Sequence, residues 1–428
     1  MSAVLKPKLH TPQIITLDQL VPGQQDALDA FAGFMLDPAQ QFFVVKGSAG
    51  TGKSTLVSHM LDNLDGLLRT QRIILDKQEI MDVYVTATTN KAVEALRGIV
   101  NREVQTIQSL IKMRVSYNPK TNKSSLVASP NFTPIENAVI LIDEPSYISP
   151  EFLQDILERT NNCKLIFTGD PYQLIDPSST GAVVFDQGWR TAELTQVVRQ
   201  DPENPICRLI EMFRQSVITG KFDVFKPDGE FVKYVDQGLF DDMLIDTFQS
   251  PDWYDSDSKV CAWTNKRVQR FNKQLSQSLH GRMVLEVDDY AINNSYFAQG
   301  GYNIKTDATV RITSKEPIKA FGVPGNRFGI NDSCYGFCPD DVNAKQQLIK
   351  ELQAKKRYSD ISDINADWID LRNAYSCTVN KSQGSTYNRI FLDLDDIGKC
   401  HRDINTMSRL LYVGASRPRS EIILTGAF

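Results

Sequence analysis

Hydrophobic and polar positions repeat in one pattern along most of this 428-residue chain. Short runs that are apolar throughout, such as "FFVV" and "VILI", each lead into a turn rich in Gly, Ser, Thr, Asn or Asp, and a stretch with helical spacing follows. Strands that are apolar on both faces are typical of parallel sheets covered by helices. The pattern therefore predicts an α/β protein whose ligands bind at the carboxyl ends of the strands, where the polar turns lie.

Two stretches depart from this pattern. Residues 112–134 contain alternating segments around a polar turn at residues 118–123, which is typical of a β-hairpin. Residues 279–368 are rich in β-like segments and turns, and they include one strongly basic helical stretch at residues 344–357. We therefore expect a hairpin and a small β-rich domain to be inserted into the α/β framework.

Composition and charge narrow the class of protein only slightly. Apolar residues make up 41% and charged residues 23%, which is ordinary for a globular protein, and the length exceeds what one hydrophobic core supports. No apolar run approaches the roughly 18 residues of a membrane span, and the N-terminus lacks a signal-peptide pattern, so we expect a cytoplasmic protein without membrane contact. Seven scattered cysteines suit a reducing compartment. The net charge of −5 neither indicates nor excludes nucleic acid.

The segment "GSAGTGKST" (residues 47–55) lies between a predicted strand and a predicted helix. Glycines let backbone N–H groups close around phosphate oxygens, and the helix N-terminus adds partial positive charge. Lys53 is expected to reach the β and γ phosphates of ATP, and Ser54 is expected to bind Mg²⁺. The predicted nucleotide-binding residues of this segment are Gly47, Ala49, Gly50, Thr51, Gly52, Lys53, Ser54 and Thr55.

Two carboxylates follow the strand "AVILI". Asp143 is expected to hold Mg²⁺, and Glu144 can accept a proton from an attacking water, although capping of the strand remains an alternative for Glu144. A kinase would need its base to face a substrate hydroxyl, so the pair favours hydrolysis. Gln173 in "GDPYQL" is placed to sense a γ-phosphate or orient water, which is a weak signal by itself.

These motifs in this order resemble a superfamily 1 DNA helicase of the 5′-to-3′ branch, which includes RecD and the Dda helicase of T-even phages. The similarity runs from about Leu20 to the C-terminus and includes "LVPGQQDAL", "TATTNKAVEAL", "ELTQVVRQ", "CTVNKSQGSTYNRIFLD" and "LLYVGASRPRSEIIL". The segment "FGVPG" is similar to a stretch of the Dda accessory domain, which favours that subgroup. The resemblance implies that Gln24 contacts adenine, that Arg199 contacts phosphate and that Gly384 belongs to the nucleotide site.

The resemblance also implies two RecA-like P-loop domains with ATP bound between them. They would comprise residues 1–188, with the hairpin at 112–134, and residues 189–278 with 369–428, while residues 279–368 would form an SH3-like β-rich accessory domain. Arg417 of the second domain would then act as an arginine finger on the γ-phosphate, an effect worth about 10³ to 10⁵ in rate in other NTPases. Arg419 matches no family position, so a solvated cation is its preferred interpretation.

Single-stranded DNA would cross both domains, and its contacts would combine small polar groups with aromatic faces. The resemblance assigns such contacts to Thr89, Asn90, Tyr172, Thr378, Asn380 and Gln383. Helix capping is an alternative for Thr89 and Asn90, and Asn380 replaces a histidine of the Dda pattern.

Two aromatic residues are further candidates for DNA contact. Phe132, at the base of the hairpin, is a candidate for strand separation, and a plain surface hairpin is an equally open interpretation. Trp368 could stack a base or seal the β-rich domain. The basic stretch at residues 344–357 could bind phosphate or be solvated.

The motifs and the resemblance together predict a monomeric, ATP- and Mg²⁺-dependent DNA helicase that acts in DNA replication or recombination. That it moves 5′ to 3′ is implied by the resemblance alone. Its expected partners are single-stranded DNA, forked duplex DNA and a single-stranded DNA-binding protein or replisome components. If the protein is encoded by a bacteriophage, its location is the host cytoplasm. A translocase that displaces bound proteins without unwinding, and a nucleotide-gated DNA-binding module, remain alternatives.

Overall fold

The computed structural model describes residues 19–74, 76, 81–118, 123–129, 132–176, 179–198, 204–250, 253, 257–299, 301–306, 308–341 and 343–427. The chain divides into two compact units. The first comprises Met1–Ile111, Asn131–Pro171 and Ile175–Asp201, and the second comprises Lys112–Pro130, Tyr172–Leu174 and Pro202–Phe428. Each unit is described separately below.

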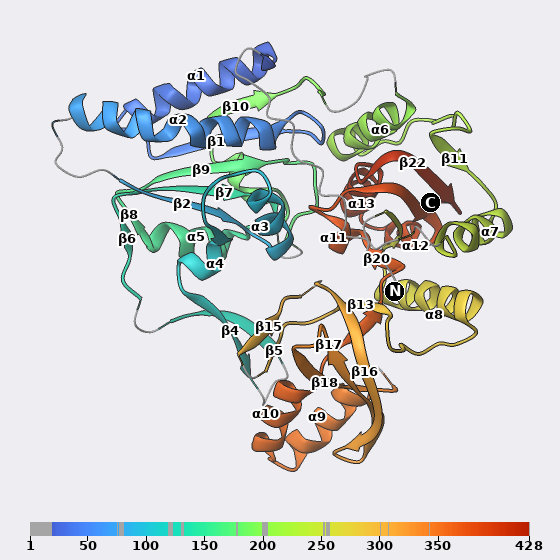
Figure 1. Ribbon diagram of the computed structural model, residues 1–428. Coiled ribbons are helices and arrows are strands. Elements are labelled where there is room, and N and C mark those ends of the chain that lie inside the picture. Colours follow the sequence, from blue (N-terminus) through green and yellow to red (C-terminus); the bar gives the residue numbers. More distant parts are fainter. Residues whose placement is uncertain are drawn as a thin grey trace, which may run out of the picture. The chain divides into compact units, whose positions relative to one another are not determined.

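A six-stranded parallel sheet forms the centre of the first unit, with the strand order β10-β1-β9-β7-β2-β3 (Figure 1). Its strands are β1 (Phe42–Gly47), β2 (Asp82–Ala87), β3 (Val104–Thr106), β7 (Ala138–Asp143), β9 (Lys164–Gly169) and β10 (Arg190–Leu194). Two short strands, β6 (Ile135–Glu136) and β8 (Thr160–Asn161), pair in parallel beside it. Because all six main strands are parallel, their carboxyl ends share one edge of the sheet, where ligands of such folds bind.

Helices cover this sheet, and local sequence signals explain where several of them start. The helices are α1 (Pro22–Leu36), α2 (Lys53–Ile74), α3 (Asn90–Arg97), α4 (Ile107–Leu110) and α5 (Pro150–Glu158), with 3₁₀ turns η2 (Pro145–Tyr147) and η3 (Val183–Asp186). Helix α5 begins where the Ser149 hydroxyl accepts a hydrogen bond from the Phe152 amide and Pro150 occupies the first turn. Helices α1, α2 and α3 bury apolar side chains in one core cluster together with the strands. This packing holds the start of α2 at the carboxyl end of β1.

The second unit contains a five-stranded parallel sheet with the order β11-β22-β21-β12-β20. Its strands are β11 (Val232–Tyr234), β12 (Ser258–Ala262), β20 (Ser376–Thr378), β21 (Tyr387–Asp393) and β22 (Pro418–Thr425). Its helices are α6 (Pro205–Thr219), α7 (Gln237–Phe248), α8 (Asn265–His280), α11 (Val379–Ser382), α12 (Leu394–Ile397) and α13 (Ile404–Ala415), with the 3₁₀ turn η4 (Gly398–Cys400). Helix α8 shows clear boundary signals, since Thr264 caps its start and Gly281, with φ +66°, ends it.

A β-rich insertion belongs to the same unit. Its antiparallel sheet has the order β18-β17-β16-β13-β19, formed by β13 (Tyr290–Asn293), β16 (Thr309–Ala320), β17 (Val323–Ile330), β18 (Cys334–Pro339) and β19 (Leu371–Asn373). Two antiparallel hairpins, β14 (Phe297–Gln299) with β15 (Tyr302–Ile304) and β4 (Met113–Asn118) with β5 (Lys123–Ala128), also belong to the second unit. The stretch predicted as one basic helix contains α9 (Ala344–Ala354), and a second helix, α10 (Tyr358–Asp367), follows.

The predicted fold class is confirmed, because two parallel sheets flanked by helices occur together with an antiparallel β-rich insertion. The domain limits at residues 188, 279 and 368 stay predictions. In the described part of the chain, no helix is both long enough and apolar enough to cross a membrane.

Candidate nucleotide and DNA sites

The phosphate loop connects β1 to α2 in the first unit. Gly50 and Gly52 have φ values of +83° and +80°, which side-chain-bearing residues rarely adopt. The Thr51 hydroxyl donates to the Ser48 carbonyl at 2.9 Å and closes the turn. The loop therefore makes a tight turn that ends at the N-terminus of α2, where the first amides of the helix favour an anion.

Lys53, the first residue of α2, directs its ammonium group back into this loop. Its Nζ donates to the carbonyls of Gly47 at 2.6 Å and Ser48 at 3.1 Å. Among the described residues, the Lys53 ammonium forms no ion pair with a carboxylate. Its charge thus remains available to an anion bound by the loop. Ser54 lies in the same helical turn and is exposed.

Gln24, which was expected to contact adenine, packs against the outside of the phosphate loop. Its side chain is 4% exposed, and its Nε2 donates to the Thr51 carbonyl at 3.3 Å. A Cβ atom added to Gly52 would come within 2.2 Å of Gln24 Nε2, so only glycine fits this position. The Val198 amide donates to the Gly50 carbonyl at 2.8 Å and ties the segment after β10 to the same loop.

Asp143 lies at the carboxyl end of β7, at the same edge of the sheet as the phosphate loop. Its Oδ1 accepts a hydrogen bond of 2.5 Å from the hydroxyl of Thr168 on β9, the strand between β7 and β1. Burial raises the pKa of the Asp143 carboxyl, and the Thr168 hydrogen bond and the nearby Lys53 cation act in the opposite direction. A bound divalent cation would favour the carboxylate form further, which suits Asp143 as a metal ligand.

Glu144 adopts a left-handed backbone conformation, with φ 54° and ψ 50°. Its amide donates to the Thr168 carbonyl at 2.9 Å, and its carbonyl accepts from the Thr88 hydroxyl at 2.7 Å. Pro145 disfavours the right-handed helical region for the residue before it, and it opens the turn η2. Backbone strain of this kind concentrates at functional sites, and here it holds the second carboxylate of the pair in a defined direction.

The segment after β9 carries Tyr172 and Gln173, which belong to the second unit. Gln173 is 3% exposed, and its backbone carbonyl accepts a hydrogen bond from Nη1 of Arg409 on α13. The Arg214 guanidinium of α6 lies over the Tyr172 ring, 5.3 Å from its centroid. Arg409 was not among the residues predicted from the sequence, because no motif singles it out; it lies on α13, eight residues before Arg417.

Arg417, the predicted arginine finger, is 7% exposed and lies between α13 and β22. Its Nε donates to the Val413 carbonyl at 3.0 Å, its Nη2 to the Ser416 hydroxyl at 2.7 Å and its Nη1 to the Ser385 carbonyl at 3.3 Å. All these acceptors are neutral, and the described residues place no carboxylate within ion-pairing distance. The guanidinium is therefore held in place without neutralisation of its charge. Arg419, on β22, is exposed.

Several residues predicted to contact DNA act as helix caps. The Thr89 hydroxyl accepts from the Ala92 amide at the start of α3, and the Thr378 hydroxyl accepts from the Lys381 amide at the start of α11. Asn90 is the first residue of α3. Asn380 is exposed on α11, where a polymer could reach it.

The nearby Gln383 is largely buried, at 7% exposure, and Gly384 follows it with φ +78°. Capping by Thr89 or Thr378 leaves a hydroxyl lone pair for another donor, so it is compatible with a second contact.

The assignment of Trp368 to DNA stacking is wrong. Its side chain is 2% exposed and packs against Phe337, with 4.7 Å between ring centroids, in the core formed by α9, α10 and the sheet of the insertion. The alternative role, sealing the β-rich domain, is the one that its burial supports.

Phe132 is the remaining candidate for DNA contact, and Arg199 is the remaining candidate for phosphate contact. Phe132 lies outside the strands of the hairpin β4–β5, and the guanidinium of Arg159 lies 4.8 Å from its ring centroid. Its role at a DNA fork stays a prediction. Arg199 lies outside the described residues.

Comparison with known proteins adds a family match and structural neighbours. Residues 19–231 match the family model of an AAA domain. An uncharacterized protein of Acanthamoeba polyphaga mimivirus is 20% identical to this chain over an alignment 501 residues long. The alignment covers 92% of this chain and 97% of that protein.

Two solved structures of Pif1 helicases are similar over nearly the whole chain. The Pif1 helicase from Bacteroides, in complex with ADP-AlF3 and ssDNA, has a TM-score of 0.50 and 15% identity, covering 96% of this chain and 92% of that chain. The Pif1 helicase from Candida albicans has a TM-score of 0.48 and 16% identity, covering 95% and 94%. The Bacteroides structure supports the fold, with its two parallel sheets and β-rich insertion. Because this structure is of a Pif1 helicase, it does not specifically support the narrower resemblance to Dda.

Proposed function

We propose that this protein is an ATP-dependent DNA helicase that moves 5′ to 3′ along single-stranded DNA and separates duplex DNA ahead of it. The observation that carries the proposal is the phosphate loop between β1 and α2, which shares a sheet edge with the carboxylates after β7. The AAA-domain match and the fold shared with a Pif1 helicase support it.

The residues of the first unit fit ATP and Mg²⁺. A Cβ atom at Gly47 would come within 2.6 Å of Thr51 Oγ1 and 3.0 Å of Leu194 Cβ, so the start of the loop is packed too closely for a larger residue. The Ser54 hydroxyl and the Asp143 carboxylate are the oxygen donors that Mg²⁺ prefers. When bound, Mg²⁺ would neutralise charge that develops on the transferred phosphoryl group.

Each candidate residue of the nucleotide site has its own role in this proposal. The Lys53 ammonium would exchange its carbonyl contacts for the β and γ phosphate oxygens. Glu144, whose backbone is held by Thr168 and Thr88, would accept the proton of the attacking water. Gln173, with its carbonyl held by Arg409, would orient that water. Gln24 and Gly384 are proposed to line the nucleotide site, and Arg199 is proposed to contact phosphate.

Arg417 is proposed to stabilise the γ-phosphate in the transition state. Its guanidinium now donates to three neutral groups, and these bonds can be exchanged for stronger charge-assisted bonds to an anionic oxygen. Since Arg417 belongs to a different compact unit from Lys53, hydrolysis would depend on how the two units move, which is how such a motor couples ATP to translocation.

For DNA, we propose contacts from Thr89, Asn90, Tyr172, Thr378, Asn380 and Gln383, with Phe132 acting at the fork. Forked duplex DNA and single-stranded DNA are the proposed substrates, and a single-stranded DNA-binding protein is a proposed partner.

The decisive experiment compares unwinding of a 5′-tailed and a 3′-tailed duplex, with phosphate release measured in the presence and absence of single-stranded DNA. We expect unwinding of the 5′-tailed substrate alone and DNA-stimulated phosphate release that Glu144→Gln abolishes. Stimulated release without unwinding of either duplex would identify a translocase. DNA binding that depends on nucleotide but shows no release would identify a nucleotide-gated binding module, and both results would refute the helicase proposal.

A further inference from the structure

Exposed aromatic side chains concentrate on the β-rich insertion. Among the described residues, the large aromatic side chains that are exposed outside the insertion are Phe231 and Tyr234. Those between residues 290 and 358 are Tyr290, Tyr296, Tyr302, Phe321, Tyr335 and Tyr358. Aromatic residues gathered on a surface mark sites that bind other macromolecules.

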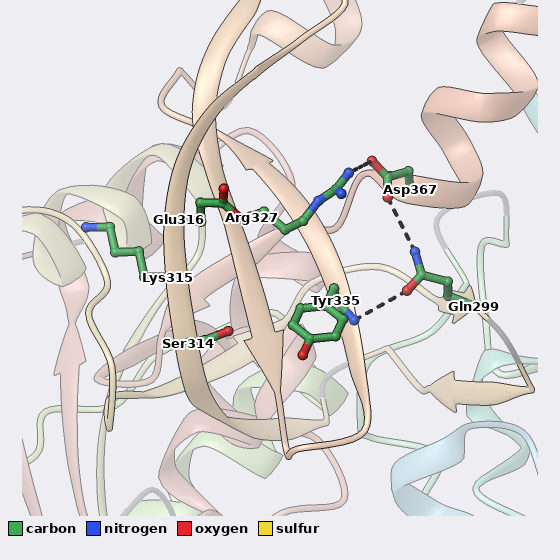
Figure 2. Close-up of a pocket in the computed structure, with 7 residues that line it drawn as sticks. All are labelled: Gln299, Ser314, Lys315, Glu316, Arg327, Tyr335 and Asp367. Atoms are coloured by element: carbon green, nitrogen blue, oxygen red, sulfur yellow. Dashed lines mark hydrogen bonds and ion pairs between the residues drawn. The ribbon is translucent and has the colours of Figure 1, made fainter.

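One of these rings, Tyr335, lines a groove of about 470 Å³ on the sheet of the insertion (Figure 2). Ser314 on β16 pairs across Gly329 on β17 with Tyr335 on β18. A Cβ atom at Gly329 would come within 2.3 Å of Ser314 Oγ, so this position has no room for a side chain. Ser314 and Tyr335 both line the groove, and the ring of Tyr335 is 58% exposed at its wall.

A chain of hydrogen bonds, drawn as dashed lines in Figure 2, connects Arg327, Asp367 and Gln299 to the backbone of Tyr335. Arg327 Nη2 donates to Asp367 Oδ2 at 3.2 Å, and Gln299 Nε2 donates to Asp367 Oδ1 at 3.3 Å. The Tyr335 amide in turn donates to Gln299 Oε1 at 3.3 Å. The groove is thus formed in advance by residues of β14, β17, β18 and α10.

The charges of the groove decide which ligand it suits. Lys315 directs its ammonium away from the groove and donates to Glu286 at 2.6 Å, while Arg327 is paired with Asp367. Glu316 is exposed, and within the described part of the chain its carboxylate forms no hydrogen bond or ion pair. The charge left over in the groove is therefore negative.

The uncompensated negative charge of Glu316 disfavours the binding of nucleic acid, because phosphates need clustered cations. Residues 279–368 contain eleven Lys and Arg and twelve Asp and Glu, and the basic stretch at residues 344–357 does not line the groove. The two described cations that do line it, Lys315 and Arg327, are already paired with carboxylates and do not offset Glu316. An exposed carboxylate beside an aromatic wall instead favours a cationic side chain next to an apolar one.

We propose that this groove binds an extended peptide segment of a partner protein, with a Lys or Arg of the peptide beside Glu316 and a proline or aliphatic side chain against the Tyr335 ring. Extended and proline-rich segments dock on aromatic-lined grooves because little conformational freedom is lost on binding. The volume lies within the range of about 300–1,000 Å³ that is typical of ligand pockets. This site is separate from the nucleotide and DNA sites proposed above and goes beyond them.

The test uses the full-length protein and a displayed library of random decapeptides. Selection should enrich sequences with a basic residue adjacent to proline or an aliphatic residue. The enriched peptide, labelled with a fluorophore, should lose about tenfold in affinity for Tyr335→Ser, as hot-spot aromatic residues do. Glu316→Gln should weaken binding by about threefold to tenfold, and Glu316→Lys should shift the preference toward a peptide whose basic residue is replaced by glutamate.

The matched control is Tyr290→Ser, which removes another exposed tyrosine of the insertion that does not line the groove. It should leave peptide affinity unchanged. Thermal denaturation verifies that each variant is folded. If Tyr335→Ser fails to fold, peptide binding by Glu316→Gln and Glu316→Lys tests the proposal.

The proposal is overturned if the selection enriches no consensus sequence. It is also overturned if substitutions of Tyr335 and Glu316 leave the binding of the enriched peptide unchanged. Binding of a labelled oligothymidine that falls with Tyr335→Ser and rises with Glu316→Lys would assign the groove to nucleic acid instead. Phosphate release and unwinding are measured separately, so failure of the groove and failure of the helicase proposal give different results.

Discussion

Lys53 and Arg417 are two cations that bond to neutral oxygens and not to carboxylates. Lys53 donates to the carbonyls of Gly47 and Ser48, and Arg417 donates to the carbonyls of Val413 and Ser385 and to the Ser416 hydroxyl. The hydrogen bonds satisfy the donors of such a cation, but no carboxylate among the described residues neutralises its charge. The same arrangement preserves the full charge for an anionic ligand.

Lys53 and Arg417 differ in how many hydrogen bonds must be exchanged before the cation can contact a phosphate. Lys53 is half-buried at the end of the glycine-rich loop, and within the described part of the chain its ammonium makes only two hydrogen bonds, both to carbonyls of that loop. Arg417 is 7% exposed and uses three nitrogen atoms to bond its surroundings, so it must exchange several bonds to reach a phosphate. We therefore interpret Lys53 as a binding residue that is ready in advance and Arg417 as a residue that acts only after a conformational change.

The largest expected effect tests Arg417. Arg417→Ala should lower DNA-stimulated phosphate release by about 10³-fold or more, as loss of an arginine finger does in other NTPases. Arg417→Lys should not restore it, because an ammonium group cannot replace the planar fork. Arg419→Ala, two residues further on, is the matched control and should retain activity within about twofold. Near-normal turnover of Arg417→Ala would refute the finger assignment.

A second variant, Lys53→Ala, separates binding from catalysis. We expect phosphate release to fall by about 10²-fold to 10³-fold, the usual cost of removing one electrostatic contact to a transition state. Binding of a fluorescent ATP analogue should also weaken for Lys53→Ala but stay near normal for Arg417→Ala. Equal losses of nucleotide affinity in the two variants would contradict the proposed difference between the cations.

Lys164 extends the comparison to a cation with a structural role. Its side chain is 4% exposed, and its Nζ donates to the carbonyls of Phe34, Asp37 and Gln40 at 2.9, 2.8 and 2.8 Å, at the C-terminal end of α1. Such carbonyls lack partners within the helix, so the lysine satisfies them.

Lys164→Met should lower the free energy of unfolding by about 2 kcal/mol, since buried acceptors lose a charged donor. Urea denaturation measures this change. Lys46→Met, which removes a partly exposed lysine 3.8 Å from Glu193, should change stability by less than about 0.5 kcal/mol and serves as the control. A loss of phosphate release per folded molecule in Lys164→Met, without a loss of stability, would contradict the structural role.

The smallest expected effect concerns Asp403, which caps the helix that leads to Arg417. The Thr406 hydroxyl and amide donate to its carboxylate and lower its pKa below the ordinary value. A lowered pKa means that this contribution to stability is present above the carboxyl's ordinary pKa and is lost as the pH falls through the folded-state pKa.

Asp403→Ala should therefore destabilise the protein by about 1 kcal/mol at neutral pH, and the difference should vanish in acid. Thermal denaturation across a pH series checks this expectation. Asp403→Asn keeps a capping oxygen, so it should cost less and show little dependence on pH. A difference between wild type and Asp403→Ala that stays constant with pH would contradict the electrostatic explanation.

Features that depend on local spacing could be predicted from the amino-acid sequence alone. The strand, glycine loop and helix around Lys53 could be predicted because the segment carries its own backbone requirements, with Gly50 and Gly52 at positive φ. The α/β class followed from strands that are apolar on both faces, since such strands must be buried under helices. The ordered motifs added the resemblance on which the assignment of Arg417 rests.

Contacts between side chains far apart in the sequence became visible only in the folded protein. Arg409 bonds to the carbonyl of Gln173 from 236 positions away, and no local pattern encodes a contact at that separation. Trp368 was wrongly assigned to DNA because its residue type allows stacking, whereas its burial against Phe337 depends on how α10 packs on the sheet. The left-handed backbone of Glu144 likewise depends on Pro145 and on hydrogen bonds to Thr168 and Thr88. Local propensity sets the elements, but burial and hydrogen bonding between distant segments set the direction of each functional side chain.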